Sequence, residues 1–407
     1  MALAIATIEA PRVEESLRAQ GVEPLVVPWS PPAQGDLADV ARLTRAYADD
    51  AVEDANRAAL DRLDAARPFV VGAGIAADMV PGMDARVVLH AGPPCEWQAM
   101  GPAMRAQVAR AVVFEGWAPD QGEAAALIAQ GAVGLAPGDA HGVAAPMCGV
   151  LSPSMATWAV HDDATGAQAW APMSDGAGDG LPPGAPTRDV LARHRLLADR
   201  VAPGVAAAVA ATGPLDMLQL VRDAADMGDL PGARPRAASL LLVHALQPGL
   251  ASRALDAVPA VATVAAAGRI ALPLLAATAR AMLQATAPAG PSSLVTALCG
   301  NGTDVGVMLA GLPGRWFTAP APIADDAVLD VGTSAPDAAA WAGDQGLMAC
   351  AQLAIDARLC LDAGEGPAVA TGIAGRTDGA WMGTGTVRMP LAAVRDALDA
   401  LVPPPGS

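Results

Sequence analysis

Apolar and polar positions along the first 90 residues alternate between helix-like and strand-like periods. Residues 51–66 place Ala55 and Leu63 on one face and charged side chains on the other, which is typical of an amphipathic helix. Residues 13–21 form a shorter pattern of the same kind. Three apolar runs have the character of buried strands: residues 24–28, 68–74 and 86–92. This order predicts a Rossmann-like parallel α/β unit over residues 1–90.

The pattern changes twice along the rest of the chain. Residues 92–184 combine many Gly and Pro residues with short apolar runs. Residues 188–286 consist of long Ala- and Leu-rich stretches broken by Pro and Gly, which predicts helices. After Pro288 the chain returns to short apolar runs and Gly loops. We therefore expect an α/β protein in three parts: a Rossmann-like domain at 1–90, a discontinuous α/β domain with Gly-rich ligand loops at 91–185 and 288–407, and an inserted helical domain at 186–287.

The basic residues narrow the possible chemistry. All 25 residues counted as Lys plus Arg are arginines. The lack of lysine excludes a P-loop nucleotide site and Schiff-base chemistry, because both need a lysine amine. Against 42 acidic residues, the arginines leave a net charge of −17, which disfavours nucleic acid and anionic membranes as partners. A bound anion must therefore be held by Arg, His, backbone N–H groups or a metal.

Other features of the composition predict a cytoplasmic protein. The most apolar region, residues 254–287, is interrupted by Asp256, Arg269 and Arg280, so we interpret it as buried helices and not as a membrane span. Residues 1–11 lack the basic segment of a signal peptide. The five cysteines form no Cys-x-x-Cys pair, which is typical of reduced thiols.

One motif suggests a nucleotide, but its context argues against that interpretation. Residues 72–77 match the Gly-x-Gly-x-x-Ala form of the dinucleotide-binding fingerprint and follow an apolar strand. However, Pro81 and Gly82 would end the following helix after about one turn, and no acidic residue at the end of the next strand could bind a ribose. We expect a Gly-rich junction between strand and loop, and we expect no cofactor.

A ligand site is expected where the strand at residues 86–92 ends in a Gly loop, because open α/β sheets bind ligands at such places. Gly92 and Pro93 form the start of this loop, and Arg105 follows it closely. A guanidinium can hold a carboxylate or phosphate through two hydrogen bonds. The simpler alternative for Arg105 is an exposed side chain on a helix surface.

Asp139 and His141 form an Asp-x-His pair in a Gly-rich segment. On an extended chain, residues two apart lie on the same face, so Asp139 would orient His141 as an acid/base pair. The pair could also supply two ligands to a metal, although two ligands alone are weak evidence for a metal site. We therefore expect catalytic residues here and no metal.

Further candidates lie in loops that are suited to binding or to capping. Hydroxyl groups at helix starts can bind anions, or they can simply cap the helix. The candidates in such loops and in a turn-rich Asn-Gly segment are Ser152, Ser154, Ser292, Ser293, Asn301 and Asp304. Arg315 and Thr318 belong to the string RWFTAP, which is either a ligand wall or a tightly packed turn. The chain has neither a Gly-x-Ser-x-Gly elbow nor a His-Glu-x-x-His motif, so serine hydrolase and zincin functions have no support.

Several strings occur together in a recognisable order. They are GPP-x-x-W, FEGWA, SPSM, MGD, SS-x-V-T-A, NG-x-D-x-G, RWFTAP and G-x-G-x-VR-x-P, starting at residues 92, 114, 152, 227, 292, 301, 315 and 383. In this order they resemble the YlbE-like family. The resemblance covers nearly the whole chain, and SPSM and RWFTAP are its most specific motifs.

The resemblance implies a reaction and a partner. The YlbE-like family supplies an AllG-type subunit to the oxamate carbamoyltransferase complex of anaerobic allantoin breakdown. The implied reaction moves a carbamoyl group between oxamate, or a related ureide, and phosphate or carbamoyl phosphate. The implied partner is an FdrA-type subunit, with a homo-oligomer as the alternative. Arg105, His141, Arg315 and Arg388 would supply donors to the carbamoyl oxygen and the phosphate.

The chain departs from the family pattern at polar positions. A His-x-His of the family corresponds to Asp139 and His141, and two family lysines correspond to Asp179 and Arg280. Arg280 keeps the positive charge, whereas Asp179 reverses it. These departures leave two hypotheses open. The chain is an active carbamoyltransferase-family subunit, or it is a catalytically degenerate subunit kept for assembly or repurposed in a biosynthetic pathway.

Overall fold

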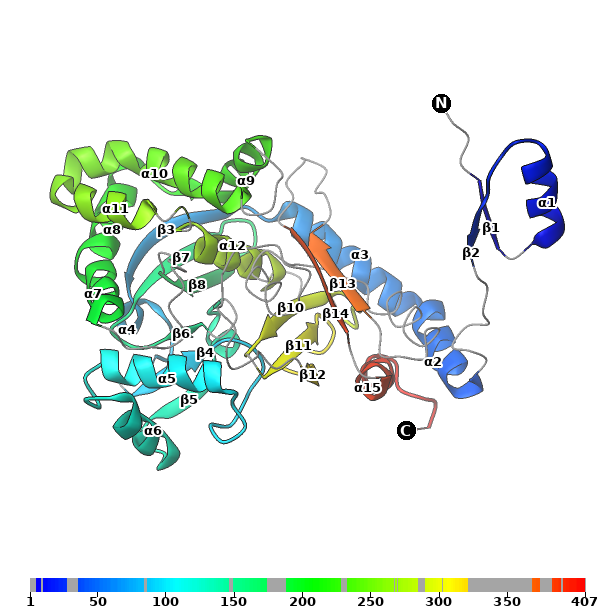
Figure 1. Cartoon of the computed structure of the whole chain (residues 1–407), viewed down its shortest axis with the longest axis horizontal. Helices are drawn as coiled ribbons and strands as arrows, with labels where there is room; N and C mark the ends of the chain where they lie inside the picture. The colour runs from blue at the N-terminus through cyan, green and yellow to red at the C-terminus, as the bar shows by residue number, and fades with distance from the viewer. Residues whose placement is uncertain are drawn as a thin grey trace.

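The computed structural model describes the chain in fourteen segments, which Figure 1 shows in colour. These are residues 5–8, 10–27, 36–83, 86–145, 149–173, 188–227, 233–266, 268, 270–284, 290–301, 303–320, 368–373, 383–388 and 391–406. Helices and strands alternate through them, and both parallel and antiparallel pairings occur. The expected α/β class is confirmed. Within these segments, no helix is long and apolar enough to cross a membrane.

The N-terminal unit consists of β1 (Ala6–Ile8), α1 (Pro11–Ala19) and β2 (Leu25–Val27). Its strands pair in parallel, as expected, and the strand and helix predicted here from the sequence are confirmed. The buried Glu14 side chain of α1 accepts a hydrogen bond from the backbone N–H of Ala10 at 2.9 Å and so caps its own helix. Figure 1 shows this unit standing apart from the rest of the chain.

The next strand does not continue that parallel unit. After α2 (Leu37–Ala48) and α3 (Asp50–Ala65), β3 (Pro68–Ile75) pairs on both sides with antiparallel neighbours. The prediction of one parallel unit over residues 1–90 was therefore wrong for β3. The alternation of strand and helix is a local pattern, and it does not determine which distant strand lies beside β3.

The sheet that contains β3 has the order β8-β7-β3-β9. Its other strands are β7 (Ala156–Asp162), β8 (Gln168–Pro172) and β9 (Leu215–Asp216). After β3, α4 (Ala76–Met79) lasts for four residues. A dinucleotide site needs a longer helix at this point, so the exclusion of a nucleotide at residues 72–77 is consistent with the structure.

A second sheet has the order β5-β4-β6. The strands β4 (Val87–His90) and β5 (Gly134–Pro137) are parallel, and β6 (Val150–Leu151) is antiparallel to β4. The crossover between β4 and β5 contains α5 (Pro102–Phe114) and α6 (Gln121–Ala129). Met104, Val108 and Val112 repeat at helical spacing on α5 and are fully buried, so this face of α5 joins the core of the sheet.

The helical block predicted after residue 188 is confirmed. It contains the elements α7 (Arg188–Leu196), η3 (Leu197–Val201), α8 (Ala202–Thr212), α9 (Met217–Asp226), α10 (Ala233–Arg253), η4 (Leu255–Ala257), α11 (Val258–Ala265) and α12 (Leu272–Gln284). Leu246 and Leu274 of this block share one buried core with Trp158 of β7 and Val70 of β3. The helices therefore pack directly on the β3 sheet (Figure 1). The domain boundaries at about residues 90, 186 and 287 remain predictions.

The C-terminal part contains a third sheet and a final helix. The sheet is antiparallel with the order β10-β11-β12, formed by β10 (Val295–Gly300), β11 (Asp304–Leu309) and β12 (Trp316–Pro320). The strands β13 (Ala368–Ile373) and β14 (Gly383–Arg388) form an antiparallel pair, and α15 (Leu391–Leu401) ends the fold.

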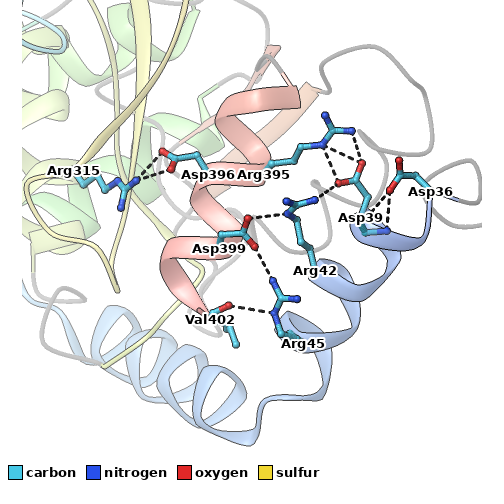
Figure 2. Close-up of polar contacts among 10 residues, drawn as sticks. Asp36, Asp39, Arg42, Arg45, Arg315, Arg395, Asp396, Asp399 and Val402 are labelled. Atoms are coloured by element: carbon cyan, nitrogen blue, oxygen red, sulfur yellow. Dashed lines mark hydrogen bonds and ion pairs between the residues drawn. The ribbon is translucent and has the colours of Figure 1, made fainter. Parts of the chain in front are cut away.

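Ion pairs join α15 to α2, as Figure 2 shows. Asp39 accepts hydrogen bonds from Arg395 at 2.6 Å and from Arg42 at 2.9 Å. Asp399 binds Arg42 at 2.9 Å and Arg45 at 2.7 Å. Helices far apart in the sequence are thus held by five alternating charges. The hydrogen bond from Arg395 is the main cause of the lowered pKa of Asp39.

Candidate functional site

The ligand loops expected from the sequence leave the β5-β4-β6 sheet at one edge. Because β4 and β5 are parallel, with His90 opposite Pro137, both strands end at the same side of the sheet. The loop at residues 91–101 follows β4, and the turn η2 (Gly138–His141) follows β5. Parallel α/β sheets commonly bind ligands at this edge, beyond the carboxyl ends of the strands.

Gly92 brings the β4 loop into backbone contact with the turn between β10 and β11. The φ angle of Gly92 is +79°, and a Cβ atom placed there would lie 2.4 Å from the backbone nitrogen of Asn301. The side chain of any other residue at position 92 would clash with this backbone, and the residue would also have to adopt an unfavourable positive φ angle. We call this contact the Gly92–Asn301 junction. It unites two segments that the sequence had suggested separately.

The buried side chain of Asn301 completes this junction. Its Nδ2 donates to the carbonyl oxygen of Pro93 at 3.2 Å. Its Oδ1 accepts from the backbone N–H groups of Thr303 at 2.8 Å and Asp304 at 2.7 Å. One amide therefore closes its own turn and binds the opposing loop. The candidates Gly92, Pro93, Asn301 and Asp304 therefore lie together.

Three more residues border the junction, and two of them were missed from the sequence. The Thr303 Oγ1 accepts a hydrogen bond from the backbone N–H of Gly101 at 2.6 Å. A Cβ atom on Gly306 would lie 3.0 Å from Pro93 Cγ, so this loop lies over β11. Thr318 is paired with Gly306 across β11 and β12 and therefore shares its face of the sheet. Gly306 belongs to the string NG-x-D-x-G, and this string was the feature of the sequence that could have pointed to it.

Arg105, Cys95 and Asp304 set the charge around the junction. In the first turn of α5, the exposed Arg105 donates to the carbonyl oxygens of Trp97 at 3.1 Å and Gln98 at 2.5 Å. Its guanidinium also lies 5.6 Å from the centre of the Trp97 ring. Burial is the main cause that raises the pKa of Cys95, and the charge of Asp304 adds to it. Burial likewise raises the pKa of Asp304.

His90 is a buried histidine at the end of β4 that was not among the residues selected from the sequence. Its Nδ1 lies 2.9 Å from the carbonyl oxygen of Ala91, and burial lowers its pKa. A carbonyl oxygen can only accept, so Nδ1 carries the proton and Nε2 is left as an acceptor. The ring is therefore neutral near neutral pH. Its position at the end of an apolar strand was the available sequence signal.

The arrangement of Asp139 and His141 differs from the expectation. Residues 138–141 form a 3-10 turn and not extended chain, so the reason for placing the two side chains on one face was wrong. Asp139 pairs with Arg280 of α12 at 2.7 Å, while His141 Nδ1 lies 3.1 Å from the carbonyl oxygen of Pro81. Asp139 thus links the η2 turn to α12. In the segments that the structure describes, no three His, Cys, Asp or Glu side chains gather to hold a metal.

The four candidate serines lie away from the Gly92–Asn301 junction. Because β6 is antiparallel to β4, Ser152 lies toward the amino end of β4, where its Oγ donates to Glu115 at 2.6 Å. The backbone N–H of Ser154 binds the same carboxylate at 2.8 Å. Ser292 and Ser293 precede β10, whereas Asn301 follows it.

Asn56 of α3 holds this second serine pair. Its Oδ1 accepts from Ser292 Oγ and from the Ser293 backbone N–H, each at 2.8 Å. Its Nδ2 donates to Ser293 Oγ at 2.9 Å. These contacts use the side chains of the pair to attach the start of β10 to α3. A ligand role for the four serines stays a prediction.

The last two arginine candidates lie in the C-terminal part. One guanidinium nitrogen of Arg315 contacts both carboxylate oxygens of Asp396 at 2.8 Å, and Figure 2 shows this pair linking α15 to the start of β12. Arg315 also lies 5.3 Å from the centre of the Phe317 ring. The string RWFTAP thus forms a packed strand, and the Arg315 side chain at its start attaches α15. Arg388 ends β14 opposite Ala368, and its side chain lies outside the described residues.

Comparison with known proteins gives a consistent family. A family model described as oxamate carbamoyltransferase subunit AllG matches residues 133–345. The oxamate carbamoyltransferase subunit AllG of Escherichia coli K12 is 30% identical, and the alignment covers 86% of this chain and 97% of that protein. The uncharacterized protein YahG of the same strain is 34% identical over 79% of this chain and 71% of its own length.

A solved structure supports the fold. The crystal structure of a conserved protein of unknown function from Enterococcus faecalis V583 aligns with a TM-score of 0.68 and 24% identity. The alignment covers 86% of this chain and 97% of that one. At this level of identity the likeness concerns the architecture alone.

Proposed function

Because the chain belongs to the family of oxamate carbamoyltransferase subunits called AllG, we propose that it takes part in carbamoyl transfer as one subunit of a complex. The group transferred is a carbamoyl group, the acceptor or donor is oxamate or a related ureide, and phosphate or carbamoyl phosphate is the second substrate. The partner is an FdrA-type subunit, and the complex works in the cytoplasm.

The observation that carries this proposal is the Gly92–Asn301 junction. Carbamoyl transfer needs donors arranged around an oxygen that gains negative charge, in a place where the substrate is held rigidly. The junction holds two loops so close together that a Cβ atom added to Gly92 would lie 2.4 Å from the backbone nitrogen of Asn301. It lies beyond the carboxyl end of β4, where this class of sheet commonly places its ligands.

Arg105 and Asp304 have the chemistry to position the substrates there. A guanidinium carries five N–H donors, and Arg105 directs two of its nitrogens at loop carbonyls. The other donors can hold the carboxylate of oxamate. In the transfer from N-carbamoyl oxamate to phosphate, the bond between the carbamoyl carbon and the oxamate nitrogen breaks and a bond between that carbon and a phosphate oxygen forms. A proton passes to the nitrogen, and oxamate leaves. Asp304, with its pKa raised by burial, is suited to deliver that proton.

A second candidate function is assembly without catalysis. The observation that favours it is the use of several candidate side chains in internal contacts. Asp139 pairs with Arg280, Arg315 with Asp396, and Ser152 with Glu115. A chain whose charged candidates hold its own elements together can serve as a scaffold for the catalytic partner.

The two functions are separated by an assay with carbamoyl phosphate and oxamate. The purified chain is incubated with and without the FdrA-type subunit, and phosphate release is measured above the spontaneous decay of carbamoyl phosphate. We expect release that depends on oxamate when both subunits are present. Arg105→Gln should lower kcat/KM for oxamate about tenfold or more, because a charge-assisted hydrogen bond to a carboxylate is lost.

The matched control is Arg57→Gln, which removes an exposed arginine that is paired with Glu53 and Asp54 on α3. This variant should retain the activity of the unaltered chain. If the complex forms and turns over but Arg105→Gln has no effect on it, the assembly function is the correct one. The lack of any turnover in an intact complex would contradict the enzymatic proposal.

A further inference from the structure

Arg110 of α5 is a partly buried arginine whose charge is not paired within the described residues. Its Nε atom is buried and has no hydrogen-bond partner, and burial lowers its pKa to about 10. Protein surrounds the side chain on nearly all sides, yet part of the residue stays accessible. Among the described residues, no carboxylate pairs with it. Buried polar groups normally have partners, so an orphan guanidinium nitrogen calls for an explanation.

His194 of α7 lies beside this arginine. Phe114 is one helical turn after Arg110 on the same face of α5, and its ring centre lies 5.6 Å from that of His194. Figure 1 shows α7 next to α5. Burial, together with the positive charges of Arg110 and Arg193, lowers the pKa of His194 to about 3. Like Arg110, His194 keeps part of its surface accessible.

The described residues around Arg110 do not neutralise its charge. Taking a charge out of water is costly unless an opposite charge or several hydrogen bonds replace the water. The carboxylate that directly follows α5, Glu115, accepts from Ser152 Oγ and from the Ser154 backbone N–H. The side chains of Arg110 and His194 thus lie near each other. Within the described segments, neither of them forms an ion pair with Asp or Glu. The charge of Arg110 thus has no partner among the described residues, and a small anion would supply one.

We propose that Arg110 and His194 form a binding site for a small oxyanion, of the phosphate or carboxylate class. The planar guanidinium can bind two oxygens of such an ion, and the imidazole can donate to a third. Both residues keep part of their surface accessible, so an ion can reach them from the solvent. This site is independent of the proposed carbamoyl transfer, because Arg105 at the start of α5 faces the loop at residues 91–101, and five residues along a helix turn to another face.

The test observes His194 directly in the full-length chain. Inorganic phosphate is titrated at constant ionic strength and near-neutral pH while the imidazole NMR signals of the five histidines are recorded. The variant His194→Gln identifies the signal of interest. We expect the His194 signals to shift saturably, and we expect Arg110→Met to weaken this response about tenfold or more. Arg57→Met, at an exposed ion pair, serves as the control and should leave the response unchanged.

A second measurement guards against misfolding of the variant. Without phosphate, Arg110→Met should have a melting temperature equal to or above that of the unaltered chain, because an uncompensated charge is replaced by an apolar side chain. Added phosphate should raise the melting temperature of the unaltered chain and leave that of His194→Gln nearly unchanged. Acetate in place of phosphate distinguishes a carboxylate site from a phosphate site.

Two results would overturn the proposal. One is a His194 signal that stays constant in both phosphate and acetate at tens of millimolar, even if other signals move. The other is an equal response in Arg110→Met and in the unaltered chain. Neither result depends on turnover. The oxyanion proposal can therefore be contradicted while the proposal of carbamoyl transfer is upheld, and the opposite outcome is also possible.

Discussion

Gly92 is the residue on which the candidate site most directly depends. Replacement by Ala combines a left-handed φ angle of +79° with a Cβ atom 2.4 Å from the Asn301 nitrogen. We expect Gly92→Ala to lower the free energy of unfolding by about 3 kcal/mol or more, since the conformational cost alone is about 1–2 kcal/mol. Urea denaturation followed by tryptophan fluorescence measures this change.

Gly116 offers a matched control for that substitution. Its φ angle is +72°, and a Cβ atom there would have no neighbour within 4 Å. Gly116→Ala therefore isolates the conformational cost, which should be about 1 kcal/mol. An equal loss of unfolding free energy in Gly92→Ala and Gly116→Ala would show that the β4 loop and the β10–β11 turn can separate without cost. The Gly92–Asn301 junction would then not be the rigid element of the site.

His194 makes the stability of the protein depend on pH. Its pKa is about 3 in the folded chain, against an ordinary value of 6.5, so the unfolded chain binds a proton first as the pH falls. The free energy of unfolding is therefore unaffected by His194 above pH 6.5. It falls as the pH drops below that value, by up to about 1.4 kcal/mol for each pH unit.

Denaturation curves between neutral pH and pH 5 measure this loss, and His194→Gln should show a smaller loss than the unaltered chain. The charged groups that act on His194 are Arg110 and Arg193, and both oppose its protonation. An identical pH dependence in the variant would mean that other groups cause it. Because a bound oxyanion favours the protonated ring, the comparison is made in a buffer without phosphate or carboxylates.

At the scale of elements, the contact between α2 and α15 depends on Asp39. The side chain is 4% exposed and accepts hydrogen bonds from Arg395 and Arg42. Asp39→Asn keeps the shape but removes the charge that both arginines share. We expect the free energy of unfolding to fall by about 2 kcal/mol, because buried ion pairs are costly to break from one side. Hydrogen exchange of α15 should become faster in this variant.

Glu53→Gln is the control for this prediction, because it alters an exposed ion pair with Arg57 on α3. Exposed pairs contribute about 0–1 kcal/mol, so the control should change stability little. If α15 exchanges at the same rate in Asp39→Asn and in the unaltered chain, then Arg315 with Asp396, and not this network, holds the helix.

The elements themselves were largely predictable, and their contacts were less so. The amphipathic period of residues 51–66 and the apolar runs at 24–28, 68–74 and 86–92 correspond to α3, β2, β3 and β4. Local periodicity reports which side of an element is apolar, and this is why it succeeded. It failed at residues 138–141, where a turn replaces the expected extended chain and Asp139 pairs with an arginine that lies 141 residues away.

At the scale of the whole molecule, the N-terminal unit stands apart (Figure 1). No hydrogen bond or ion pair joins residues 5–27 to the other described segments. Leu25 is 69% exposed, and a sheet of two strands with one helix is marginal in water. We expect the amides of α1 to exchange far faster than those of α5, and deletion of residues 1–35 to leave the melting temperature of the remainder nearly unchanged.

Both measurements are made on the same protein preparations, with the full-length chain as reference. A drop of more than about 5 °C on deletion would correspond to roughly 4 kcal/mol or more for a chain of this size. It would show that the unit packs on the remainder in solution. Strong protection of the α1 amides would have the same meaning.

The sequence by itself determined the chemistry that is available and most of the elements. It excluded lysine-dependent mechanisms, indicated an α/β chain with a helical block, and pointed to Gly92, Asn301 and Asp304 as polar or flexible positions next to strands. These conclusions rest on residue type and local period, which are properties of the chain before it folds.

The tertiary structure alone decided which of these residues meet. Gly92 touches Asn301 across 209 positions because the β4 loop packs on the β10–β11 turn, whereas Ser152 and Ser292 are carried to the far ends of their sheets. It also paired Asp139 with Arg280 and left Arg110 beside His194 without an acid among the described residues. Partners of this kind depend on strand order and helix packing, and they follow from the sum of many distant contacts that no short stretch of sequence encodes.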